Sequence, residues 1–279
     1  MGLMKLNYRS ETLGTFVNVT VVFPTDVLTV NEREGRFPYQ NGMLFQTIYL
    51  LHGGGEDDST VIRYTNAEAY AQKNCVMLVI PSLPNSFFLD TDYGVKSGTF
   101  LTDELPKVIR TLFASSPDRN DNFIMGYAMG GSGALAAAIR RPDLYRTCVD
   151  ISGGVPLGLN LDLLKGFLKN GNSPLRIYEK TFLPADQLDG SIYDLSFILK
   201  KGLAEGREYP DFLVVTGSEE GVILDWMKEE YRILKDAGTR AEMKVMDGYG
   251  HEMALWDHCL GLAMDSWLPL SRRPVYPEE

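Results

Sequence analysis

Long apolar segments are absent from this sequence. No run approaches the roughly 18 apolar residues that indicate a transmembrane helix. The opening MGLMKLNYRSETLG has no apolar stretch long enough for a secretory signal peptide. We therefore expect a cytoplasmic protein without a membrane partner, unless a secretion signal was trimmed from this chain.

Cysteine is also scarce. Cys75, Cys148 and Cys259 are odd in number and widely spaced, and none belongs to a CxxC pair. This pattern disfavours disulfides and zinc sites, and it indicates buried free thiols in a reducing compartment. The G-x-G-x-x-G fingerprint and the Walker lysine are missing as well, which argues against a phosphate-cradling loop.

Positive charge is in deficit. Lys and Arg number 27 against 37 Asp and Glu, which leaves a net charge of −10. Phosphate backbones and anionic membrane surfaces repel such a chain, so nucleic acid is not an expected partner. The length of 279 residues is sufficient for one large α/β domain with a substantial core.

Segments typical of strands and of helices alternate along the chain. Residues 16–24 alternate and are rich in β-branched side chains, as half-buried strands are. Short apolar runs, which are typical of parallel strands covered on both faces, lie at residues 46–55, 75–81, 122–127, 146–154 and 211–217, and residues 241–248 indicate a weaker further strand. Helical spacing of apolar residues marks Leu101 to Leu112 and Leu224 to Leu234. The order predicts one α/β domain over 1–279 with a doubly wound, mostly parallel sheet.

Residues 155–208 interrupt this alternation. The segment is too long for a simple crossover and mixes short apolar pieces with Gly, Pro and Asn. We expect it to be a cap or lid inserted over the carboxyl edge of the sheet.

The stretch GYAMGGSG at residues 126–133 follows an expected strand and opens into a helix of small residues. With serine in place of Ala128 it would read G-x-S-x-G, the strand-to-helix turn that carries a hydrolase nucleophile. Glycine neighbours suit such a turn because the backbone must approach closely there. A tight packing turn is the alternative. Ser132 is a weak substitute nucleophile, because it lies a full turn inside the helix.

The stretch LLHGGGEDD ends another apolar run before this turn. Hydrolases take one oxyanion-hole amide from such a loop and one from the residue after the nucleophile, which here are Gly54 and Met129. Two such donors together stabilise a developing oxyanion by several kcal/mol. A glycine-rich turn with His52 in a packing role is the alternative.

The sequence has three histidines, and we expect His251 to be the general base. It lies in DGYGHEMALW, a loop between the last expected strand and the final helix, where catalytic side chains gather. His258 lies within the helical stretch LWDHCLGLAMDSWL, where packing or surface exposure is expected.

A carboxylate should orient this base, and in chain order it should lie between positions 128 and 251. The expected strand DFLVVTG is followed directly by Glu219 and Glu220, with Asp225 slightly later. We favour Glu220. A solvated acidic pair before a helix N-terminus is the alternative, since the helix dipole stabilises it.

Taken together, these motifs resemble α/β-hydrolases of the esterase D, tributyrin esterase and feruloyl (cinnamoyl) esterase group over roughly residues 8–268. The motifs YLLHGGG, ELPKVI, GYAMGGSGAL, RPDLYRTCVDISGG, VVTGSEE and GHEMALWD follow the order and spacing of that family. The resemblance implies a catalytic triad of nucleophile, acid and base at positions 128, 220 and 251, with Gly54 and Met129 in the oxyanion hole.

The resemblance also implies the chemistry. Such enzymes hydrolyse acetyl, other short acyl or hydroxycinnamoyl esters, often on plant cell-wall carbohydrates, and they need no metal or organic cofactor. The expected partner is therefore a small-molecule or carbohydrate-linked ester, and a homo-oligomer is compatible with the sequence. Phe87, Phe88 and Tyr93 either wall an aromatic acyl group or, as we favour, pack structurally.

Two departures from the family pattern matter. Glutamate replaces the usual aspartate at position 220, and Ala128 removes the nucleophile. Loss of the serine costs on the order of 10⁶ in turnover. The surrounding motif is intact, which favours a deliberate serine-to-alanine change that leaves the ester uncleaved. A natural non-catalytic ester- or carbohydrate-binding relative, or a thioesterase of the S-formylglutathione hydrolase type, is the alternative.

Overall fold

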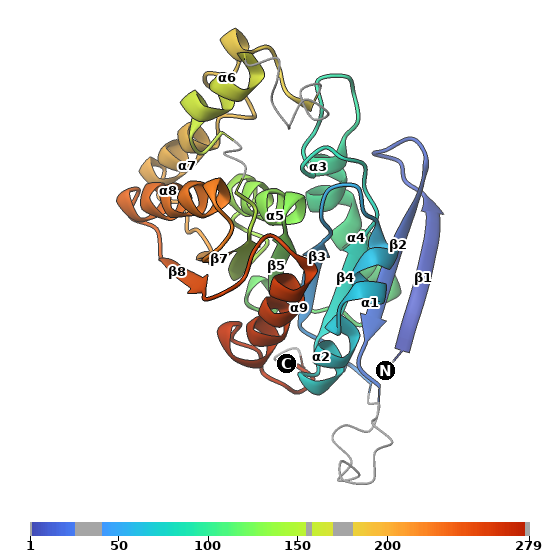
Figure 1. Cartoon of the computed structure of the whole chain (residues 1–279). Helices are drawn as coiled ribbons and strands as arrows, with labels where there is room; N and C mark the ends of the chain where they lie inside the picture. The colour runs from blue at the N-terminus through green and yellow to red at the C-terminus, as the bar shows by residue number, and fades with distance from the viewer. Residues whose placement is uncertain (1, 26–40, 155–157, 170–180, 277–279) are drawn as a thin grey trace.

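The computed structural model describes residues 2–25, 41–154, 158–169 and 181–276, and its centre is a single twisted sheet (Figure 1). Eight strands lie in the order β1-β2-β4-β3-β5-β6-β7-β8. Their bounds are Gly2–Arg9 (β1), Phe16–Phe23 (β2), Thr47–Leu51 (β3), Met77–Pro81 (β4), Asn122–Tyr127 (β5), Thr147–Ile151 (β6), Asp211–Gly217 (β7) and Ala241–Met246 (β8). Strands β3 to β8 run parallel, whereas β1 and β2 are antiparallel to their neighbours.

Strand register brings the candidate site together at one edge of the sheet. Leu51 at the end of β3 pairs with Gly126, and Tyr127 at the end of β5 pairs with Ile151. On β7, Val215 pairs with Ile151. The loops that follow these strands therefore begin side by side at the carboxyl edge, where binding sites form in α/β sheets.

Helices cover both faces of the sheet, each over its own hydrophobic cluster. On one face lie α3 (Ser97–Thr99), the π-helical turn η1 (Phe100–Glu104), α4 (Leu105–Leu112), α5 (Met129–Arg140), α6 (Leu161–Lys169), α7 (Leu195–Ala204) and α8 (Val222–Asp236). On the other lie α1 (Asp58–Tyr64), α2 (Ala67–Lys73), α9 (Met253–Leu262) and the π-helical turn η5 (Ala263–Trp267). Short 3-10 turns are η2 (Arg119–Asp121) and η4 (Ala185–Gln187). This architecture confirms the predicted α/β class with one mostly parallel sheet.

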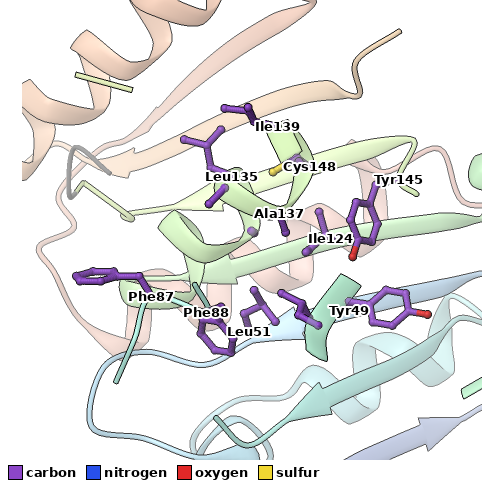
Figure 2. Close-up of a cluster of buried hydrophobic side chains, with 14 of the residues drawn as sticks. Tyr49, Leu51, Phe87, Phe88, Ile124, Leu135, Ala137, Ile139, Tyr145 and Cys148 are labelled. Atoms are coloured by element: carbon purple, nitrogen blue, oxygen red, sulfur yellow. The ribbon is translucent and has the colours of Figure 1, made fainter. Parts of the chain in front are cut away.

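Helix α5 lies in the middle of the first face. Its residues from Met129 to Ile139 are all buried, and small side chains let it lie close to the strands. Figure 2 shows Leu135, Ala137 and Ile139 of this helix among the side chains of Tyr49, Leu51, Ile124 and Cys148. The helix is therefore held rigidly, and so is the turn from which it starts.

The burial of single side chains bears on several sequence predictions. The three cysteines are free and buried, as predicted. Phe87 and Phe88 are 1% exposed and belong to the core, whereas Tyr93 is 59% exposed. The two phenylalanines thus pack structurally, as we favoured, whereas the same expectation for Tyr93 was wrong, because its side chain faces solvent. Strand β1 was not predicted. Within the described residues, no helix has the length and apolar character needed to cross a membrane.

The segment expected to form a cap, 155–208, is described in part, since residues 155–157 and 170–180 lie outside the described residues. The described part carries α6, η4 and α7, and α7 packs on α5. Asp194 caps α7 by accepting a hydrogen bond from the backbone of Phe197 at 3.0 Å. That this segment covers the site remains a prediction.

Candidate active site

The turn between β5 and α5 has the geometry of a nucleophile elbow. Ala128 has φ 51° and ψ −124°, a conformation that non-glycine residues rarely adopt. Its amide donates to the carbonyl of Ile151 at 2.9 Å, and its carbonyl accepts from the amide of Gly131 at 3.0 Å. The turn is thus over-determined by hydrogen bonds, which is how backbone strain persists at functional sites.

The glycines around Ala128 are required by close backbone approach. A Cβ on Gly126 would lie 2.3 Å from the carbonyl oxygen of Gly130. A Cβ on Gly130 would lie 2.2 Å from the carbonyl oxygen of Leu51, at the end of β3. The G-x-A-x-G pattern therefore reflects the packing of the elbow against itself and against β3.

The loop after β3 leaves one glycine amide free. The Gly53 amide donates to Oε2 of Glu56 at 3.1 Å, and the Gly55 amide donates to Oδ1 of Asn85 at 2.7 Å. Among the described residues, neither the Gly54 amide nor the Met129 amide donates a hydrogen bond to an acceptor. These are the two donors that the sequence predicts for an oxyanion hole, and both remain available to a ligand.

His52 supports this loop from below. The ring is buried, its Nδ1 lies 2.8 Å from the carbonyl of Gly53, and its Nε2 accepts from the amide of Leu83 at 3.3 Å. Because Nε2 accepts, Nδ1 carries the proton and donates. Burial, outweighing a hydrogen bond to Gly53, lowers the pKa of His52. The packing role is therefore the one that the structure shows.

His251 and Glu220 form a hydrogen-bonded pair. Nδ1 of His251 lies 2.7 Å from Oε1 of Glu220, whose side chain is completely buried. A carboxylate only accepts, so Nδ1 carries the proton and Nε2 keeps a free lone pair. The structure thus joins these two predicted residues in the base–orienter arrangement of a triad.

Three further donors hold Glu220. Its Oε2 accepts from the amide of Gly217 at 2.8 Å, from the hydroxyl of Ser152 at 2.9 Å, and from the hydroxyl of Thr216. Burial alone would raise the pKa of Glu220, but the hydrogen bonds from His251 and these donors outweigh it, and the pKa lies below its ordinary value. Glu220 therefore stays ionised beside the imidazole.

The alternative candidates lie elsewhere. Glu219 is exposed, and so is Asp225, whose carboxylate lies 3.8 Å from the ammonium of Lys228. His258 is exposed on α9 and stacks on the ring of Tyr249. Ser132 is buried inside α5, and its hydroxyl has no described partner. None of these four is hydrogen-bonded to the His251–Glu220 pair.

Two aromatic rings connect the base to the elbow. The ring of His251 meets Trp256 edge to face with centroids 5.0 Å apart. Trp256 in turn stacks on Tyr127 at 4.7 Å, and Tyr127 directly precedes Ala128. Ala128 packs against the hydrophobic cluster that contains both rings. One continuous set of contacts therefore runs from the imidazole to the turn.

Sequence reasoning missed the residues that support the site. Ser152, which holds Glu220, has φ 55°, and the glycines that follow it in ISGG were the available signal for a tight turn. Thr216 lies on β7, where nothing local distinguishes it from other strand residues. Glu56 and Tyr127 were not predicted either, and their carboxylate–hydroxyl contact joins positions far apart in the chain.

Comparisons with known proteins find similar esterases and hydrolases. Residues 37–174 match a family described as putative esterase. The chain is 22% identical over 270 residues to an acetyl esterase of Caldicellulosiruptor saccharolyticus, covering 96% of this chain and 98% of the relative. A solved S-formylglutathione hydrolase from Staphylococcus aureus superposes with a TM-score of 0.77 at 24% identity, over 96% of this chain and 98% of that one. A ferulic acid esterase structure does so with a TM-score of 0.65 at 20% identity, over 94% and 96%.

The fold, the elbow, the buried acid–base pair and these likenesses all point to one class. The chain has the α/β-hydrolase fold and is similar over residues 37–174 to a family described as putative esterase, with alanine at its elbow.

Proposed function

We propose that this chain carries the machinery of a serine carboxylesterase and that Ala128 stands where the nucleophilic serine would be. The observation that carries the proposal is the bond of 2.7 Å between Nδ1 of His251 and Oε1 of Glu220. This hydrogen bond leaves Nε2 of His251 free to act as a base. His251 lies at the carboxyl edge of the sheet, where the elbow also begins.

A serine at position 128 completes the reaction. Nε2 of His251 takes the hydroxyl proton as the oxygen attacks the ester carbonyl, and Glu220 stabilises the imidazolium that forms. The amides of Gly54 and Met129 receive the negative charge on the carbonyl oxygen. His251 then protonates the departing alcohol, leaving an acyl-enzyme. Water, deprotonated by the same nitrogen, releases the carboxylic acid.

The backbone conformation of Ala128 supports the proposal that a nucleophile once stood at this position. A residue with φ 51° costs on the order of 1–3 kcal/mol in strain, and alanine gains no chemistry in return. Glycine would relieve this strain in a protein that only needed the turn. The rest of the elbow is intact, so we propose a serine-to-alanine change that lets ester or product bind without turnover.

The substrate class that we propose is a short acyl, acetyl or hydroxycinnamoyl ester, including esters on cell-wall carbohydrates. The likeness to an acetyl esterase and to a ferulic acid esterase supports this range. No residue of the described site narrows it to one acyl group.

The test is the Ala128→Ser protein, assayed on p-nitrophenyl acetate and methyl ferulate beside the alanine form. We expect turnover to rise by several orders of magnitude, up to about 10⁶. Equal rates in the two proteins would remove the esterase proposal.

A natural binding protein is the second candidate, and Ala128 itself favours it, because alanine cannot attack a carbonyl. It predicts an alanine codon in the genomic gene and tight binding of an ester without turnover. Sequencing that gene, together with titration calorimetry of methyl ferulate, separates it from the first proposal.

Thioester hydrolysis is the third candidate, and the likeness to an S-formylglutathione hydrolase favours it. Within the Ala128→Ser protein, S-formylglutathione would then be turned over with a higher kcat/KM than either oxygen ester. The same substrate panel decides between them.

A further inference from the structure

Glu56 joins the two segments that supply the free amides. Its Oε2 accepts from the amide of Gly53 at 3.1 Å and from the hydroxyl of Tyr127 at 2.6 Å. Gly53 immediately precedes Gly54, and Tyr127 lies two residues before Met129. One carboxylate oxygen is therefore shared between the loop after β3 and the elbow after β5.

Tyr127 is suited to hold its side of this contact. The side chain is buried, and its ring is fixed by stacking on Trp256. Burial, reinforced by the Glu56 carboxylate, raises the pKa of Tyr127 far above its ordinary value, so the hydroxyl remains a donor. Loss of the Tyr127 proton therefore does not break the contact in the pH range in which an esterase is assayed.

We propose that Glu56 is a positioning residue that fixes the separation of the Gly54 and Met129 amides. This inference rests on the proposed function of those amides as the oxyanion hole. The developing oxyanion needs both donors about 3 Å away at once, so a clamp between their segments acts mainly on the transition state.

The role of the carboxylate is geometric. A negative charge close to an oxyanion opposes catalysis, so an acceptor oxygen at this place, and not the charge, is what the site uses. Glu56→Gln keeps an oxygen that can accept both hydrogen bonds, whereas Glu56→Ala removes it. The two variants therefore separate positioning from electrostatics.

Glu104 provides a matched control. Its Oε2 also accepts from one backbone amide, that of Thr12 at 2.7 Å, and from one hydroxyl, that of Ser10 at 3.0 Å. Like Glu56 it is half-buried, but it ties the β1–β2 turn to η1, away from the candidate site. Glu104→Ala loses the same kind of contact without touching either amide segment.

The experiment combines kinetics with hydrogen exchange. In the Ala128→Ser protein we expect Glu56→Ala and Tyr127→Phe each to lower kcat by about tenfold or more, with KM within about twofold, because only the transition state uses both amides. Their double variant should lose little beyond either single one, since both break one clamp. Glu56→Gln should recover most of kcat, and Glu104→Ala should retain it.

Hydrogen exchange, measured by mass spectrometry on the alanine form, tests the Glu56 clamp independently of catalytic activity. Tyr127→Phe should speed exchange in the peptide spanning residues 52–56, although the substitution lies far away in sequence. Unchanged exchange there, or equal kcat losses in Glu56→Ala and Glu104→Ala, would overturn the clamp. An inactive Ala128→Ser protein would instead overturn the proposed function. The hydrogen-exchange result alone would then decide whether Glu56 holds the two segments together.

Discussion

The imidazole of His251 and the carboxylate of Glu220 meet at 2.7 Å, yet the ring is 37% exposed and the carboxylate is fully buried. Three further hydrogen bonds hold the buried carboxylate in place, so the carboxylate orients the imidazole ring from a fixed position. The opposite ring nitrogen, Nε2, has no hydrogen-bond partner among the described residues. The pair therefore has a buried, immobile half and a reactive half.

Removing this carboxylate should disable a restored enzyme. In the Ala128→Ser protein we expect Glu220→Gln to lower kcat by about 10⁴, because the amide no longer holds the reactive tautomer of His251. The measurement is steady-state hydrolysis of p-nitrophenyl acetate. Its neighbour Glu219 is exposed, and Glu219→Gln should stay within about twofold of the parent. Equal losses in the two variants would contradict the assignment.

Glu220 should also contribute to stability in a defined pH window. Its pKa is lowered, because hydrogen bonds outweigh burial, so the unfolded chain binds the proton more readily than the folded one. The contribution is present above the ordinary carboxyl pKa, about 4.3, and is lost as the pH falls through the lower folded value. Urea unfolding between pH 3 and 6 should therefore show a shallower acid loss for Glu220→Gln than for the parent.

Two other buried carboxyl groups predict the opposite dependence of stability on pH. Asp150 on β6 and Glu230 on α8 are both buried, and each carboxyl group acts on the pKa of the other; the Gly153 amide donates to Asp150 at 2.8 Å. Two buried carboxylates repel each other when both are ionised, which favours a proton on one of them. Burial raises the pKa of both groups, and the negative charge of Glu220 acts on Asp150 in the same direction.

Because the folded chain holds this proton more tightly, the pair's contribution is complete below the ordinary carboxyl pKa. It is lost as the pH rises through the raised folded values, by up to about 1.4 kcal/mol per pH unit for each proton. Glu230→Gln removes one of the titrating groups. Its unfolding free energy, measured between pH 5 and 8, should fall less steeply than that of the parent. Parallel curves would show that the pair does not hold a proton.

Glycine at position 130 should be irreplaceable. A methyl group there would lie 2.2 Å from the carbonyl oxygen of Leu51, so Gly130→Ala should destabilise the fold by about 3 kcal/mol or more. Gly166, exposed inside α6, has open space within 4 Å of the place that a Cβ would take. Gly166→Ala should instead stabilise by about 0.5–1 kcal/mol, through helix propensity. Thermal unfolding of both variants measures the contrast.

Strain at the elbow predicts that the fold becomes more stable when the side chain of Ala128 is removed. Ala128→Gly relieves a strain of about 1–3 kcal/mol and loses about 0.4–1 kcal/mol to the greater freedom of the unfolded chain. We expect a net stabilisation of about 1 kcal/mol, seen as a higher midpoint in urea unfolding. A lower midpoint would mean that the positive φ of Ala128 carries no strain.

Strands buried on both faces were predictable because their apolar runs are nearly continuous. Thr47–Leu51, Asn122–Tyr127 and Asp211–Gly217 all lie within the predicted runs. Strand β1 was missed since it lies at the sheet edge, where most of its side chains are exposed and its pattern of burial is weak. Hydrophobic pattern reports burial, so an exposed edge strand gives little signal.

The sequence by itself determined the α/β class, the place of the elbow at Ala128 and the short choice of bases and acids, because turn chemistry and apolar periodicity are local properties. Only the tertiary structure decided for Glu220 over its neighbour Glu219, and only it joined Glu56 to Tyr127 and Ser152 to Glu220. Those contacts depend on strand register and helix packing between distant segments. A hydrogen bond across 68 residues leaves no mark on the residues next to either partner.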